Sequence, residues 1–305
     1  MNAPDVLADV GSPAAGERQA ADEYYNALPL PTASMTFNVY GDDEVKHRLN
    51  ELFNYKCAYC ETDFGPGMPV DVEHFRPKGR VVGPAGNLLF PGYWWLASTW
   101  ANLLPSCIDC NRGRWHQLDG SRYKYGKESL FPLKGGAMPA TTPAAVATEE
   151  PLLIDPAAED PSAHLNHVYK QSPAGRSESV VEPTIGAHGT EDPRGRASIE
   201  IYGLNRPRLA YSRKRTIERM KSAIDNVELL YSLADDEGHQ AKKDRLKENG
   251  RQALNQIVRD YLHWMNPYAA SCRAYFRKWL EDFRSNGSAP YGRGDSRRRA
   301  RGRWV

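Results

Sequence analysis

Two short stretches of the sequence carry side chains that could carry out a hydrolysis. The stretch "DVEHFRPK", residues 71–78, places Glu73 directly before His74, and "CIDCN", residues 107–111, ends in Asn111. A histidine with an unperturbed pKa of about 6.5 can take a proton from water at neutral pH. Carboxylate and amide oxygens suit a hard cation such as Mg²⁺ or Mn²⁺. These residue types predict a general base that works beside a divalent cation.

Four of the five cysteines form two C-x-x-C pairs, Cys57 with Cys60 and Cys107 with Cys110, and 46 residues separate the pairs. In a reducing compartment this arrangement favours a metal site over disulfides. Four thiolates close a tetrahedral zinc shell, which predicts a structural Zn²⁺ without an open position for chemistry. The alternative is four unrelated buried cysteines. Cys272 stands apart on an apolar helix face and is expected to be a packed thiol.

The residues before Glu73 limit where its side chain can point. The alternation in "VDV", residues 70–72, indicates a strand, and side chains of consecutive strand residues point to opposite faces. Glu73 and His74 could therefore reach one site only at a strand end or through a local distortion. The sequence leaves this point open.

The order Cys-x-x-Cys, Glu-His, Asn-Leu-Leu and Cys-x-x-Cys-Asn resembles the zinc-bearing branch of the HNH endonucleases, whose core is a ββα-metal unit. The stretches "EHFRPK", "YWWLASTWANLLPSCIDCNR" and "LFPL" look like the PtuB-like HNH component of Septu anti-phage systems. The segments "PLLIDPAAEDPSAHL" and "IYGLNRPRLAYSRKR" extend the likeness, which covers about Tyr55 to Arg215. Many HNH enzymes have Asp where this chain has Glu73.

The resemblance implies a role for each matching residue. Glu73 and Asn111 would bind the catalytic Mg²⁺ or Mn²⁺, and His74 would be the general base. Asn102 matches the middle asparagine of the motif, which braces the loop that carries the histidine. The resemblance also implies a partner, an ATPase subunit of the PtuA type.

Four basic residues flank these elements and are expected to contact phosphates of a nucleic acid: Arg76, Lys78, Arg112 and Arg114. A group of aromatic residues could stack on bases, although such a group more often fills the core of a small domain. Its members are Tyr93, Trp94, Trp95 and Trp100.

The positive charge of the chain is concentrated at one end. The 305 residues carry a net charge of +2, and residues 285–305 hold six arginines against one aspartate, which leaves −3 for the rest. This tail either binds a polyanion or is a solvated, disordered end. No apolar run approaches the roughly 18–20 residues of a membrane span, and the N-terminus does not resemble a secretory signal. We therefore expect a cytoplasmic protein without a membrane partner.

The expected fold class is α+β, with a small zinc-stabilised ββα-metal core and a helical C-terminal region. Asp42 or Asp43 can cap a helix with Val45 and Leu49 on its apolar face. Five segments are expected: a disordered N-terminal extension (1–35), an HNH nuclease domain (36–135), a linker with short strands (136–196), a helical region (197–284) and a disordered Arg-rich tail (285–305).

The favoured function is a metal-dependent HNH endonuclease that cuts DNA, as the toxic effector of an anti-phage defence system. The same site could instead cut RNA, including transfer RNA, because no base-reading element is evident. A protein of another class, a non-catalytic zinc module that binds nucleic acid or protein, would explain the cysteines and the tail. It would give no reason for the Glu-His and Cys-Asn placements.

We expect Cys107→Ser to lose zinc and to impair folding, because a structural zinc contributes about 10–16 kcal/mol of apparent binding energy. Zinc content and the thermal unfolding midpoint measure both effects. The Cys272→Ser variant, which lies outside both pairs, should keep its zinc. A Cys107→Ser protein with the zinc content of the wild type would contradict the four-thiolate site.

Overall fold

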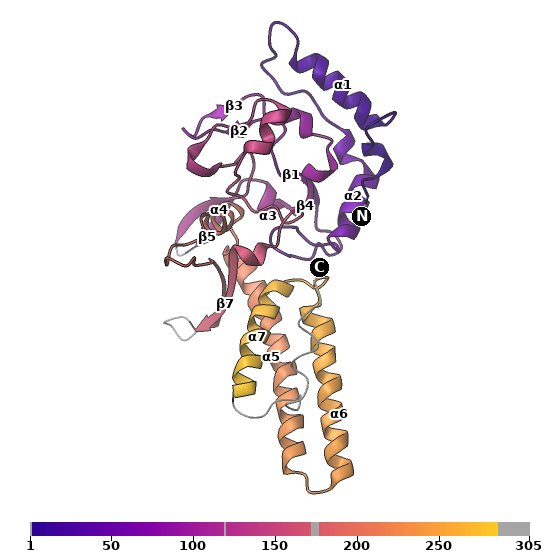
Figure 1. Cartoon of the computed structure of the whole chain (residues 1–305), viewed down its shortest axis with the longest axis vertical. Coiled ribbons are helices and arrows are strands. Elements are labelled where there is room, and N and C mark those ends of the chain that lie inside the picture. Colours follow the sequence, from indigo (N-terminus) through magenta and orange to yellow (C-terminus); the bar gives the residue numbers. More distant parts are fainter. Residues whose placement is uncertain (1, 119, 172–176, 286–305) are drawn as a thin grey trace. The chain divides into compact units, whose positions relative to one another are not determined.

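A computed structural model describes residues 2–118, 120–171 and 177–285 of the chain. They form two compact units. The first unit contains the described residues up to His167 together with Val180–Tyr211, and the second contains those of 168–179 together with the chain from Ser212 onward. The first unit mixes strands and helices, and the second is mainly helical (Figure 1).

The centre of the first unit is a ββα element. Strand β1 (Val70–His74) pairs antiparallel with β4 (Leu103–Cys107), in a register that sets His74 opposite Leu103. Every residue of β4 is buried, and the short helix α3 (Ile108–Asn111) follows it directly. The predicted α+β class with a ββα core is confirmed. The second C-x-x-C pair occupies the junction between β4 and α3.

The residues between β1 and β4 form a compact insertion, which includes the paired strands β2 (Val81–Val82) and β3 (Leu88–Leu89). The aromatic group predicted to fill a core contributes to it. Tyr93 is fully buried and lies edge-on to Phe131. Trp94 stacks on Tyr25 at 4.9 Å between ring centroids.

The N-terminal segment is folded, which corrects the expectation of disorder for residues 1–35. Helix α1 (Pro13–Tyr25) begins at Ser12, whose hydroxyl accepts a hydrogen bond from the backbone N–H of Ala15. Ala14, Ala21 and Tyr25 are buried on one face of the helix. The composition suggested disorder because alanines supply this face. Their spacing of seven and four residues places them on one helical stripe.

Helix α2 (Asp43–Leu52) follows the sequence prediction closely. The Asp42 carboxylate caps it by accepting from the N–H of Glu44 at 2.8 Å. Val45 and Leu49 are buried against Leu103 of β4 and Ala14 of α1. The helix therefore covers one side of the ββα element.

After α3 the chain forms a two-stranded ribbon of β5 (Arg114–Leu118) and β6 (Ser121–Tyr125), and later a second ribbon of β7 (Leu165–Gln171) and β8 (Ser177–Pro183). Helix α4 (Pro193–Tyr202) belongs to the first unit. Short helical turns occur at Asp5–Leu7, Val39–Gly41, Trp94–Leu96, Trp100–Asn102, Lys134–Gly136, Pro143–Thr148 and Pro161–Ala163. The stretch expected to be a linker, 136–196, buries Leu153 and Ile154 and is part of the folded unit.

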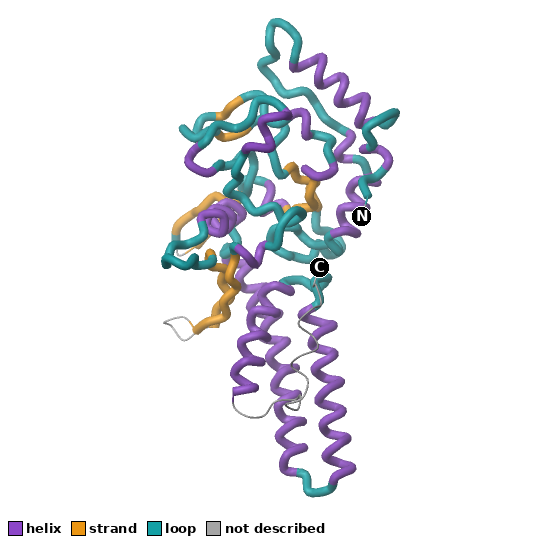
Figure 2. The backbone as a smooth tube through the Cα atoms, viewed as in Figure 1, coloured by secondary structure: helices purple, strands orange, loops and turns teal. Residues whose placement is uncertain are grey.

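The second unit contains most of α5 (Pro207–Asp236), together with α6 (Gln240–Ile257), α7 (Ala269–Ser285) and a π-helical turn over Val258–Leu262 (Figures 1 and 2). Their core includes Met220 and Val227, both fully buried, and the thiol of Cys272, which is a packed side chain as expected. Gly250 lies within α6 and is buried. A Cβ there would lie 2.7 Å from the Tyr231 ring, so glycine permits close packing of two helices.

No helix among the described residues is both long and apolar enough to cross a membrane. The arginine-rich tail predicted over residues 285–305 lies, from residue 286 on, outside the described part of the chain.

Candidate metal centre and active site

The four cysteines of the two C-x-x-C pairs gather at one buried position. Their sulfur atoms all lie within 4.8 Å of one another, and the Sγ atoms of Cys60 and Cys107 are 3.8 Å apart. A regular tetrahedron with Zn–S bonds of about 2.3 Å has sulfur–sulfur edges of about 3.8 Å. A hydrogen bond from Ala58 N to Pro105 O, at 2.9 Å, ties the first pair to β4. The donor set and its spacing fit a closed zinc shell.

A single arginine contacts three of the four sulfurs. The Nη2 atom of Arg206 lies 3.6 Å from the sulfurs of both Cys60 and Cys107, and its Nη1 lies 3.6 Å from that of Cys110. The residue is only 3% exposed. Sequence reasoning missed Arg206, because its 96-residue separation from Cys110 forms no recognisable ligand spacing. The only signal was its position in "IYGLNRPR", one of the stretches that carry the resemblance.

The positive charge of Arg206 lies beside the sulfur atoms, which would carry negative charge when a metal is bound. Four thiolates around Zn²⁺ carry a net charge of −2, and burying uncompensated charge is costly. Hydrogen bonds from the other three cysteines, followed by the positive charge of Arg206, lower the pKa of Cys60 well below that of an ordinary thiol. Burial raises the pKa of Cys110. The guanidinium thus offsets part of the charge that metal binding creates.

A second buried cation holds Glu73. The ammonium of Lys127 lies 2.6 Å from Oε1 of Glu73 and donates to the backbone oxygen of His74 at 2.8 Å. Lys127 is fully buried and Glu73 is 5% exposed. Burial raises the pKa of Glu73 and lowers that of Lys127, whereas their mutual contact opposes both shifts. Lys127 was also missed from the sequence, although it lies directly before "ESLFPL".

Asn111 lies on the same side of β1 as Glu73. Its Nδ2 donates to Oδ2 of Asp71 at 2.9 Å, and Asp71 and Glu73, two residues apart on the strand, share one face. Lys127 reinforces this placement, because its backbone N donates to the oxygen of Cys110 at 2.8 Å. The structure therefore brings Glu73 and Asn111 to one face and adds Asp71, which orients the Asn111 amide.

His74 points to the opposite face of β1, so the strand does not bring its ring next to the Glu73 carboxylate. Its Nε2 lies 2.8 Å from the backbone oxygen of Ala97, and the Tyr40 ring meets it edge-on at 4.5 Å. Because a carbonyl oxygen can only accept, Nε2 carries the proton and Nδ1 keeps its lone pair. In the described part of the chain the Nδ1 atom has no hydrogen-bond partner, and it is not fully buried.

The environment keeps the His74 imidazole neutral. Burial, followed by the charge of Lys78, lowers the pKa of His74 well below 6.5. The Lys78 ammonium lies 4.1 Å from the centre of the Tyr40 ring that packs on His74. A neutral imidazole with a free Nδ1 lone pair is the form that a general base requires.

Asn102 ties together the segments on both sides of His74. Its Oδ1 accepts from the backbone N of Arg76 at 2.7 Å, and its Nδ2 donates to the backbone oxygens of Arg76 and Leu96. Leu96 precedes Ala97, whose carbonyl holds the imidazole. Asn102 thus links the backbone that follows His74 to the turn that contains Ala97, and its role as the middle asparagine of the motif stays a prediction.

The N-terminal helix supports the same segment. Glu17 of α1 accepts from the Ser98 hydroxyl at 2.5 Å and from the backbone N of Asn38 at 2.6 Å. Ser98 follows Ala97 directly. Residues that the sequence assigned to a disordered extension therefore help to position the carbonyl that orients His74.

The four predicted phosphate contacts differ in availability. Arg76 is held internally, because its Nε donates to the buried Glu149 at 2.8 Å and its guanidinium lies over the Phe131 ring. Lys78 lies beside Tyr40 and His74, as described above. The side chain of Arg112 is 63% exposed and pairs with Asp71, and that of Arg114 is 47% exposed and pairs with Asp109.

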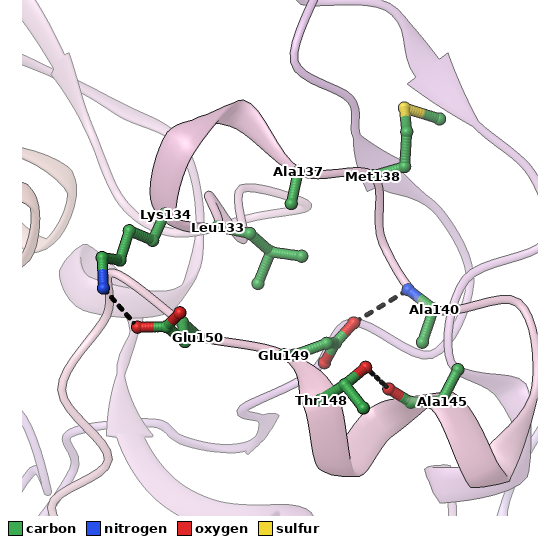
Figure 3. Close-up of a pocket in the computed structure, with 9 residues that line it drawn as sticks. All are labelled: Leu133, Lys134, Ala137, Met138, Ala140, Ala145, Thr148, Glu149 and Glu150. Atoms are coloured by element: carbon green, nitrogen blue, oxygen red, sulfur yellow. Dashed lines mark hydrogen bonds and ion pairs between the residues drawn. The ribbon is translucent and has the colours of Figure 1, made fainter.

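A shallow pocket on the connector that follows Phe131 contains none of the predicted site residues. Nine residues line it: Leu133, Lys134, Ala137, Met138, Ala140, Ala145, Thr148, Glu149 and Glu150 (Figure 3). Its charges already have partners: Lys134 pairs with Glu150, and Glu149 accepts from the backbone N of Ala140. Among the described residues, Glu149, which also accepts from Arg76, is the one lining residue that hydrogen-bonds a predicted site residue through its side chain.

No family model matches the chain, and no solved structure matches it. The chain is 34% identical over 203 residues to the Septu protein PtuB of Bacillus mycoides, which covers 65% of this chain and 58% of the relative. It is 26% identical over 197 residues to PtuB of Bacillus thuringiensis, covering 63% and 54%. It is also 26% identical over 177 residues to the HNH endonuclease assigned to retron Vc95 of Vibrio cholerae, covering 58% and 64%.

The chain thus spans less than two thirds of the length of each of these relatives. The comparisons confirm the resemblance to PtuB-like HNH proteins that the motifs indicate. They add to the buried four-cysteine cluster, which fits the zinc-bearing form of that fold.

We expect Arg206→Met to weaken zinc retention by about 10–100-fold, the range typical of residues that support metal ligands. Zinc transfer to a chromogenic chelator measures the effect. Arg208→Met, an exposed neighbour on the same turn, is the matched control and should retain zinc normally. If Arg206→Met gives up zinc no faster than this control, the guanidinium does not stabilise the cluster.

We expect Lys127→Met to lower the free energy of unfolding by about 3–5 kcal/mol, because it leaves the Glu73 carboxylate buried and unpaired. The double variant Glu73→Gln/Lys127→Met should recover most of that loss. Urea denaturation measures both, with Lys134→Met, one partner of an exposed pair, as a control that costs about 1 kcal/mol or less. Equal losses in the single and double variants would show that the pair does not act as a unit.

Proposed function

We propose that the chain is a metal-dependent HNH endonuclease that hydrolyses phosphodiester bonds, with DNA as the favoured substrate. One observation supports this most: Glu73 and Asn111 lie on one face of β1, and the strand ends at His74, whose Nε2 contacts the backbone oxygen of Ala97. The similarity to PtuB and to a retron HNH endonuclease supports a nuclease with a role in anti-phage defence. A cytoplasmic location is part of the proposal.

The oxygen ligands of the proposed catalytic site are already oriented. Lys127 holds Oε1 of Glu73, which leaves Oε2 for a cation. Because the Asn111 amide donates through Nδ2 to Asp71, its Oδ1 is the atom available as a ligand. A bound Mg²⁺ or Mn²⁺ would supply Lewis-acid stabilisation of the phosphate and of the leaving oxygen.

His74 is the proposed general base. The carbonyl of Ala97 fixes the proton on Nε2, so the attacking water would lose its proton to Nδ1. Glu73 and His74 leave opposite faces of the strand, but both stand at its end. For both to serve one phosphate, the substrate must lie across the end of β1, where Asn102 fixes the turn that follows.

The protein is further proposed to act with an ATPase subunit of the PtuA type. The similarity to PtuB supports this partner. Cleavage of RNA, including transfer RNA, by the same site is the second candidate, since the site contains groups for a phosphate and none that read bases.

We expect the wild type to cut plasmid DNA in the presence of Mg²⁺ or Mn²⁺. The His74→Ala substitution should lower the cleavage rate by a factor of about 10²–10⁴. Asn111→Ala should lose cleavage as well, because it removes an oxygen ligand. His47→Ala, whose side chain is 65% exposed on α2, is the matched histidine control and should remain active. Total transfer RNA serves as the parallel substrate, and each reaction is repeated with the co-expressed ATPase subunit.

Zinc content and thermal midpoint are compared first, so that lost cleavage is not mistaken for lost folding. Equal nucleic-acid binding without cleavage by wild type and His74→Ala, with and without the ATPase subunit, would replace the nuclease with a non-catalytic binding module. Unfolding of His74→Ala would mean that the histidine is structural.

A further inference from the structure

The β5–β6 ribbon is rooted at the proposed active site. Its first strand begins three residues after Asn111, and its second strand ends two residues before Lys127. The returning chain pairs with the end of α3, because the N–H of Glu128 donates to the oxygen of Asn111 at 2.7 Å. The two segments cross closely at Gly126, which has a φ of +111° and where a Cβ would lie 2.1 Å from the backbone oxygen of Arg112. The base of the ribbon is therefore fixed relative to Asn111.

The two faces of the ribbon have different surroundings. Tyr125 lies on one face, partly buried, and its ring fills the space above Gly203, where a Cβ would lie 2.5 Å away. The other face carries the cross-strand pairs Trp115–Lys124 and Gln117–Arg122. All four of these side chains are exposed. This second face, defined by Trp115, Gln117, Arg122 and Lys124, is called the outer face below.

Trp115 has no evident packing role. It is 60% exposed, although burying an indole would help a two-stranded ribbon that is only marginally stable by itself. The guanidinium of Arg122 lies 5.2 Å from the centre of its ring, so an aromatic plane and a cation are already arranged together. Residues 114–125 hold three basic residues and one acidic residue. The surface is thus aromatic, positively charged and next to Asn111.

We propose that the outer face binds a single strand of nucleic acid, with an unpaired base stacked on Trp115 and phosphates on Arg122 and Lys124. This inference rests on the proposed nuclease function and deepens it. A single strand fits better than a duplex, because paired and stacked bases do not offer their faces to an exposed indole, whereas stacking on aromatic side chains is the usual mode of single-strand binding. Lys124 pairs with Glu128 at the surface, a weak interaction that a phosphate can replace.

The outer face lies close to Asn111, which limits how far a bound strand is from the proposed active site. Trp115 is four residues from Asn111, so at about 3.3 Å per residue no more than about 13 Å of chain separates them. A strand stacked on Trp115 would therefore lead towards Asn111, one of the proposed metal ligands.

The test measures binding apart from cleavage. A short fluorescein-labelled oligodeoxyribonucleotide, alone and annealed to its complement, is titrated with the zinc-loaded full chain without added Mg²⁺ or Mn²⁺, and anisotropy is recorded. Trp115→Ala should weaken single-strand binding by about 5- to 150-fold, the effect of losing one base–aromatic stack. Trp115→Phe, which keeps a ring, should retain most of it. Trp264→Ala removes an indole that is 45% exposed in the second unit and should bind like the wild type.

Single-strand binding by Trp115→Ala that equals the wild type would overturn the proposal, as would absence of single-strand binding by the wild type. An equal loss on single strand and duplex would also overturn it, by showing that the ribbon reads the backbone or a groove. A selective single-strand loss supports it. If that loss is found and no variant cuts nucleic acid with metal, the nuclease function fails while the binding face stands.

Discussion

Four sulfur atoms from two turns must lie within 4.8 Å of one another, and much of the first unit follows from that constraint. The second turn joins β4 to α3, so closing the cluster fixes the direction in which α3 leaves the sheet. Asn111 is the last residue of α3, and the β5–β6 ribbon departs just beyond it. The four-cysteine cluster thereby determines where Asn111, the proposed oxygen ligand, and the β5–β6 ribbon, the proposed nucleic-acid contact, can be. The proposed hydrolysis site includes Asn111, and the second cysteine pair of the cluster that positions Asn111 begins only four residues earlier in the chain, at Cys107.

Two buried cations make this arrangement electrostatically possible. Arg206 faces the sulfur cluster and Lys127 faces Glu73, so each concentration of negative charge in the core has its own counter-ion. Both come from segments downstream of the groups they neutralise. The pairs differ in what they preserve: Arg206 supports a closed metal shell, whereas Lys127 keeps one carboxylate oriented and ties it to the backbone of His74.

The sequence could predict what depends on local spacing. The C-x-x-C pairs, the cap and apolar face of α2 and the opposite directions of Glu73 and His74 are all periodic or nearest-neighbour features, and the structure has them. The sequence could not predict three contacts, because each joins residues more than fifty positions apart without a repeating pattern. They are the contacts of Arg206 with the sulfurs, of Lys127 with Glu73 and of Arg76 with Glu149. Helix α1 escaped detection because its buried face is made largely of alanine, which composition alone reads as disorder. The proposed roles of the site residues remain predictions from the resemblance.

The contact between Arg206 and the sulfurs changes what counts as an autonomous fragment of this chain. A piece cut at residue 135, where the expected HNH domain ends, would contain all four cysteines and both strands of the ββα element and yet lack the guanidinium that faces them. The first unit, which includes Arg206 together with the four cysteines, ends only at Tyr211, beyond α4. The motif that identifies the core is therefore smaller than the core itself.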